Sequence, residues 1–221
     1  MRKKRCLALL LGAAMALSLC ACGKTADGDM SIQPAQLTEE ENRLLELLDV
    51  GMEQYRIFDF TVSGKVQSIQ IHTYELKNGM WEVLAGGGGQ AFTDPSGRLA
   101  LRFGKLTEGV GTALQGETCH SAVSYTLPPE QDGVSLSYAT STLSRGVSLA
   151  YDQEIPLVIQ VATTKNEIHS YDVDYFNKPE EYAKLGYEHV YAITVLFSQE
   201  PVDGAQPDAS DPPAGSTAPE G

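Results

Sequence analysis

Positively charged residues are scarce in this sequence. It has 16 Lys and Arg residues against 29 Asp and Glu residues, which gives a formal net charge of −13 at pH 7. Proteins that bind nucleic acid neutralise its phosphates with Lys and Arg, and a face that lies on anionic lipid head groups needs the same residues. The composition therefore argues against nucleic acid as a partner and against a domain face that rests on the membrane surface.

Long apolar runs are also missing. The apolar run at residues 6–21 follows the basic N-terminus "MRKKR" and precedes a polar segment. At about 16 residues it is shorter than the roughly 18 to 20 that a membrane-spanning helix needs. A basic start, a short apolar run and a polar continuation are typical of a secretory signal peptide. We therefore expect residues 1–21 to be removed on export, and a membrane-spanning anchor is the less favoured interpretation.

The apolar run ends in Leu19-Cys20-Ala21-Cys22. These residues resemble the lipobox of bacterial lipoproteins, with an aliphatic residue at Leu19, a small residue at Ala21 and the obligatory cysteine at Cys22; Cys20 departs from the usual Ala or Ser. The resemblance covers residues 1–22 only. It implies that the signal peptidase recognises Leu19 and Ala21, and that Cys22 carries diacylglycerol and often a further acyl chain such as palmitate. Two acyl chains give stable anchoring, so we expect a lipid-anchored protein on the cell membrane, facing outside the cytoplasm.

Cysteine is too scarce to support a disulfide in the exported chain. Cys6 and Cys20 leave with the signal peptide and Cys22 is lipidated, which leaves Cys119 alone. The domain must therefore be stabilised by its hydrophobic core. Cys119 itself is open to two interpretations, a small buried apolar residue or a reactive thiol.

Composition divides the expected mature chain into three segments. Residues 22–37 hold the lipidated cysteine and a small, polar stretch without periodicity, which predicts a flexible tether. Residues 199–221 contain five Pro, no Lys or Arg and no aromatic residue, and such a segment buries too little apolar surface to fold. Residues 38–198 are left as a single domain.

The first element of this domain is predicted to be an amphipathic helix. Thr38 and Glu41 have the spacing of a capping box, Leu44, Leu47 and Leu48 share one face, and Gly51 ends the segment. A second, short helix is indicated by Pro179 near its start and Gly186 at its end.

The rest of the domain alternates apolar and polar residues with a period of two, which predicts strands. Asn78-Gly79 predicts a two-residue hairpin turn, and Asp94-Pro95-Ser96-Gly97 predicts a type I turn. About ten short strands with little helix favour an all-β fold, an antiparallel β-sandwich. The predicted strands are 58–62, 68–71, 98–103, 122–127, 134–138, 147–151, 155–162, 171–176 and 189–198.

Catalytic motifs are missing as well. The glycine run 86–89 has no Lys-Ser/Thr after it, no G-x-S-x-G elbow occurs, and the four histidines have no zinc-binding spacing. Cys119 and His120 are adjacent, so on a strand they would point to opposite faces. We therefore expect no enzyme activity and no cofactor or metal.

One pair of carboxylates keeps an alternative open. Asp172 and Asp174 lie two residues apart, so a strand would place both on one face, about 7 Å apart. Paired carboxylates could hydrolyse a glycosidic bond or share a calcium ion, although no EF-hand pattern continues from them. This gives the alternative hypothesis of a cell-envelope hydrolase; a solvated strand face is the simpler interpretation.

The favoured hypothesis is a noncatalytic module that binds a protein, a peptide or a glycan. Residues 169–191 contain five of the ten tyrosines, and tyrosine is common on recognition surfaces. We expect Tyr182 and Tyr187 to be exposed around the short helix and to form the ligand-binding surface together with Asp172 and Asp174. Against this, tyrosine is also a common strand residue that packs on a core.

Overall fold

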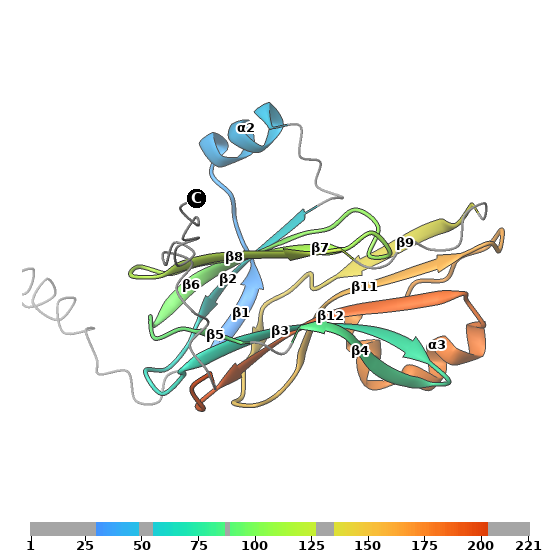
Figure 1. Ribbon diagram of the computed structural model, residues 1–221. Helices are drawn as coiled ribbons and strands as arrows, with labels where there is room; N and C mark the ends of the chain where they lie inside the picture. Colours follow the sequence, from blue (N-terminus) through green and yellow to red (C-terminus); the bar gives the residue numbers. More distant parts are fainter. Residues whose placement is uncertain (1–29, 49–54, 87–88, 127–134, 203–221) are drawn as a thin grey trace, which may run out of the picture.

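The computed structural model describes residues 30–48, 55–86, 89–126 and 135–202. Within these ranges the protein is mostly β-structure, arranged as two antiparallel sheets with two short α-helices (Figure 1). The signal peptide, Cys22 with Leu19 and Ala21, and residues 203–221 of the predicted tail lie outside these ranges. The lipid anchor and the disorder of residues 203–221 therefore stay predictions. Residues 199–202 of the predicted tail are described, and the Glu200 carbonyl accepts a hydrogen bond from the Ser68 hydroxyl at 2.7 Å.

The first sheet, sheet A, has the strand order β10-β1-β2-β6-β7-β8. Its central strands follow the predicted alternation: Phe58 and Phe60 of β2 and Leu99 and Leu101 of β6 are buried. Its strands are β1 (Ser31–Pro34), β2 (Tyr55–Thr61), β6 (Ser96–Arg102), β7 (Val110–Gln115), β8 (His120–Tyr125) and β10 (Val147–Ser148).

The second sheet, sheet B, has the order β4-β3-β12-β11-β9, and β5 also pairs with β3. Asn78 and Gly79 have positive φ values and connect β3 to β4 as a two-residue hairpin, with Lys77 opposite Met80, as predicted. Its strands are β3 (Ser68–Lys77), β4 (Met80–Gly86), β5 (Gln90–Ala91), β9 (Ser137–Thr142), β11 (Ile155–Thr163) and β12 (His189–Ser198).

The apolar faces of the two sheets share one core. Phe60 of sheet A lies 5.2 Å, centroid to centroid, from Phe197 of sheet B and the same distance from Phe92, and all three rings are buried. Full burial of such a side chain stabilises the fold by about 1.5 to 3 kcal/mol. The core can therefore support the domain without a disulfide.

The other face of sheet B is covered by a 3-10 helix, η1 (Val173–Asn177), and by α3 (Pro179–Leu185). Val173 and Tyr182 are the buried residues of these two elements. Pro179 occupies the first turn of α3 and Gly186 ends it in the left-handed conformation, as the sequence predicted.

Two predictions about elements are wrong. Residues 31–34, assigned to the flexible tether, form β1, whose Ile32 is completely buried between β10 and β2. Residues 171–176, predicted as a strand, contain most of η1, which buries Val173 and packs Tyr175 and Phe176 against the core without strand alternation.

The predicted turn at residues 94–97 is also absent. Ser96 and Gly97 already belong to β6 and lie opposite Thr61 and Phe60 of β2. The carboxylate of Asp94 instead accepts hydrogen bonds from the backbone N–H of Thr118 at 2.9 Å and from its hydroxyl at 2.7 Å. This contact holds the segment against the β7–β8 connection.

Candidate functional site

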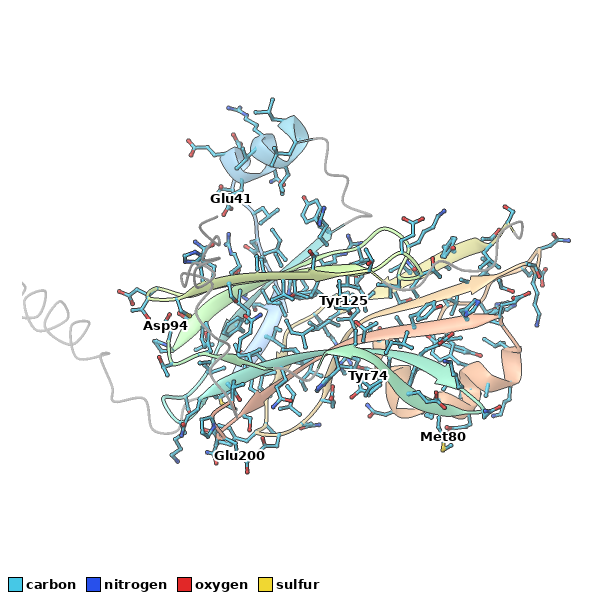
Figure 2. All side chains as sticks on the ribbon, viewed as in Figure 1. Glu41, Tyr74, Met80, Asp94, Tyr125 and Glu200 are labelled. Atoms are coloured by element: carbon cyan, nitrogen blue, oxygen red, sulfur yellow. The ribbon has the colours of Figure 1, made fainter. Side chains whose placement is uncertain are left out.

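Helix α2 (Glu39–Leu47) stands on the outer face of sheet A (Figure 1). The predicted capping box is present: the Thr38 hydroxyl accepts the Glu41 backbone N–H at 3.2 Å, and the Glu41 carboxylate accepts the Thr38 backbone N–H at 2.7 Å. Arg98 of β6 donates to Glu41 and also, at 2.8 Å, to Asp59 of β2. Figure 2 shows Glu41 at the base of the helix, on the side of the sheet. These contacts hold the first turn of α2 against strands β2 and β6.

The leucine stripe of α2 is not packed on the core. Leu44 is 55% exposed, Leu47 80% and Leu48 61%. Scattered exposed leucines need no explanation, but three on one short helix form an apolar surface of the kind that marks interaction sites.

Leu45 faces an apolar groove of about 370 Å³ between the helix and sheet A. The floor of the groove is one row of paired residues across four strands, Ile57 of β2, Ala100 of β6, Ala113 of β7 and Ala122 of β8. Alanine on three neighbouring strands leaves space above the sheet, because the alanine side chain does not extend beyond Cβ. Larger residues at the same positions would fill the groove.

The charges on the helix side of the groove are acidic. Hydrogen bonds from the Thr38 backbone and from Arg98 lower the pKa of Glu41 below its ordinary value, and Glu39, Glu40 and Glu46 are exposed. Arg43 lies near Glu39, 3.9 Å away. The helix side of the groove is therefore acidic, whereas Arg102 of β6 lines the groove on the side of the sheet.

A second cluster of polar side chains lies on sheet B. Glu154 accepts hydrogen bonds at 2.8 Å from the Tyr74 hydroxyl and at the same distance interacts with Nδ1 of His72. Burial would raise the pKa of Glu154, but His72, the Thr194 hydroxyl dipole and Tyr74 together lower it. Burial and the carboxylate raise the pKa of Tyr74.

This cluster connects strands and has the features of a structural contact. Thr194 lies opposite His72 in the β3–β12 ladder, and Glu154 comes just before β11, so one carboxylate joins β3 to the segment that enters β11. Glu154 Oε2 and Thr194 Oγ1 are buried in the described structure without a hydrogen bond of normal geometry. Neither the groove nor the cavity beside α3 borders the cluster.

The two tyrosines expected on the binding surface serve the fold instead. Tyr182 is completely buried and its hydroxyl donates to the Tyr171 carbonyl at 3.2 Å, so the prediction that Tyr182 is exposed is wrong. Tyr187 is half-buried, and its hydroxyl accepts the His169 backbone N–H at 2.6 Å. Both line a cavity of about 240 Å³ between α3 and the β3–β4 turn.

Asp172 and Asp174 are both exposed, but not on a strand. Asp172 precedes η1, and Asp174 accepts a hydrogen bond from Arg145 at 2.7 Å. The strand geometry on which the hydrolase hypothesis depended is therefore absent. In the described ranges, no group of three or more His, Cys, Asp or Glu residues is placed to hold a metal ion.

Cys119 is half-buried, and its thiol donates to Asp94 at 3.6 Å. Burial and the neighbouring carboxylate raise the pKa of the thiol. A nucleophilic cysteine needs the opposite shift, because the thiolate is the reactive form. Cys119 therefore has the environment of a structural residue.

Comparison with known proteins gives no family: no family model, no curated protein and no solved structure matches this chain. None of the helices in the described part of the chain is long and apolar enough to cross a membrane.

Proposed function

We propose that this protein is a lipid-anchored, extracytoplasmic β-sandwich that acts as a noncatalytic interaction module, and that it binds a segment of a partner protein in the groove between α2 and sheet A. The observation that carries the proposal is the exposure of Leu44, Leu47 and Leu48 on the same helix whose Leu45 lines an apolar groove. Covering these side chains removes apolar surface from water, which stabilises a complex by about 25 cal/mol per Å² before the costs of association.

The chemistry of the groove selects the kind of partner. Its floor of Ile57 and three alanines favours apolar side chains over sugar hydroxyls, which need hydrogen-bonding groups. The exposed carboxylates of Glu39, Glu40 and Glu46 favour positive charge beside the apolar contact. The partner segment therefore has an apolar stripe flanked by Lys or Arg. An anionic lipid surface lacks this complementarity, because it would repel the same carboxylates.

Site-specific photo-cross-linking in the native cell tests this proposal. A photoreactive amino acid replaces Leu44 or Leu48 in the full chain, and Met80 serves as the matched control because it is 66% exposed yet lies on β4, on the opposite side of the molecule from α2 (Figure 2). We expect the two helix positions to capture one protein that the Met80 position does not capture, through a segment with apolar residues and adjacent Lys or Arg.

Three results would contradict the proposal. They are equal capture from Met80, capture of an acidic segment, and capture of lipid alone.

A further inference from the structure

Strand β8 is an edge of sheet A, and in the described structure its only ladder partner is β7. Among the described residues, no strand pairs with its outer side, and an edge of this kind can accept another strand. The strand is held in place rather than frayed, because the hydroxyls of Tyr125, at its end, and Thr73 of β3 share a hydrogen bond.

The edge lacks the features that usually prevent strand addition. Its sequence, HSAVSY, has no Lys, Arg, Asp, Glu or Pro, and its register with β7 continues over six pairs without a bulge. Strand β4, at the edge of sheet B, has a register shift beside Thr73 and an exposed Glu82. Strand β9, at the other edge, has its Ser141 hydroxyl bonded to Ser170. Natural proteins protect edges by such charges, bulges and covering contacts.

The charge around β8 makes a second copy of the chain an acceptable partner. Residues 96–126 carry Arg98, Arg102 and Lys105 against Glu108 and Glu117, a net charge of +1. Three carboxylates that contact this segment, Glu41, Asp59 and Asp94, bring the balance to −2, whereas the whole chain carries −13. Strand β8 has no Lys, Arg, Asp or Glu, so pairing at this edge brings little of the chain's negative charge together. Residues 203–221 of the same chain are a poor occupant, because prolines and acids disfavour a strand.

We propose that β8 pairs antiparallel with β8 of a second copy across a two-fold axis. An antiparallel contact between identical strands is self-complementary, as a two-fold interface requires. With the axis at Val123, Val123 lies opposite Val123 of the second copy and Ala122 lies opposite Ser124, so that paired side chains share a face and no charged side chain meets its equivalent. The two A sheets become one sheet, and both grooves open on the same side of it. This inference is independent of the proposed partner.

The mass of the full chain in detergent, measured by light scattering with the detergent subtracted, tests the proposal. Val123 is 50% exposed, so Val123→Lys and Val123→Glu leave the core intact, and Val83→Lys is the matched control on β4, where Val83 is 57% exposed. We expect the wild-type protein and Val83→Lys to be dimers at micromolar concentration. Each Val123 variant should be a monomer, because like charges face each other across the axis, and an equimolar mixture of Val123→Lys and Val123→Glu should recover the dimer.

Circular dichroism melting checks that the variants are folded. A wild-type monomer, dissociation by Val83→Lys, or a mixture that stays monomeric overturns the proposal. The cross-linking experiment at Leu44 and Leu48 does not depend on these results, so the two proposals fail separately.

Discussion

Glu154 is a carboxylate that its neighbours keep charged. Its pKa is lowered below the ordinary value although burial acts in the opposite direction, because His72, Thr194 and Tyr74 stabilise the ionised form. The pKa of Glu75 is also lowered, because its contacts with His189 and Lys77 outweigh the effect of burial. A lowered pKa in the folded state means that the group stabilises the fold above its unfolded-state pKa of about 4.3, and that this contribution is lost as the pH falls through the folded-state pKa.

Glu154→Gln should therefore change both the stability and its pH dependence. At pH 7 we expect a loss of about 1 to 3 kcal/mol, because the hydrogen-bonding partners lose a charged acceptor. Between about pH 5 and 3, stability should fall less in the variant than in the wild type, because glutamine does not titrate. Urea unfolding across this pH range measures both effects. Glu46→Gln, on the exposed side of α2, is the control; a parallel pH dependence of Glu154→Gln and the wild type would show that Glu154 does not contribute.

Individual residues were the hardest to predict from the sequence. Tyr182 lies on α3 and Tyr187 two residues after its end, and nothing local distinguishes a tyrosine whose ring fills a core from one at its margin. The groove floor was missed for a related reason: Ala100, Ala113 and Ala122 occupy polar-face positions of three separate strands, and their alignment depends on register. A small apolar residue where alternation calls for a polar one was the available signal.

At the scale of elements, the predictable strands were those with several alternating large apolar residues. Strand β12 has the bounds predicted for it, 189–198, and β11 nearly so. Strand β7 was missed because Gly111 and Ala113 blur its alternation, and β1 because Ile32 is its only large apolar residue. The capping box and the Pro and Gly of α3 identified the helices, since caps are local. The burial of the leucine stripe of α2 could not be predicted in the same way, because it depends on which distant strands pack against the helix.

Strand β1 leads to a prediction about the boundary of the domain. Ile32→Ala should destabilise the protein by about 2 to 5 kcal/mol, because it removes a fully buried side chain and leaves a cavity. Gln33→Ala is the control on the same strand, since Gln33 is exposed, and should change stability by less than about 0.5 kcal/mol. Urea unfolding compares the two. If both substitutions had equally small effects on stability, residues 31–34 would belong to the tether and not to the folded domain.

For the whole molecule, the question is what holds it at the membrane. The described residues contain no spanning helix, and the acidic charge of the chain opposes adsorption to anionic lipid. Anchoring is then expected to depend on Cys22 alone. Cys22→Ser should abolish fatty-acid labelling and release the protein from washed membranes, measured by metabolic labelling and fractionation. Cys119→Ser is the control and should label normally; labelling of the Cys22→Ser protein would contradict the proposed anchor.

The position of β1 also determines how the molecule would carry mechanical load. A chain anchored at Cys22 and bound to a partner through α2 is pulled from its N-terminus, and the first described element that receives this force is β1. Because β1 lies between β10 and β2, a pull along the strand strains hydrogen bonds to both neighbours together, whereas an edge strand would peel away from a single neighbour. If the proposed anchor and partner both hold, tension between them would act first on a strand that is paired on both sides.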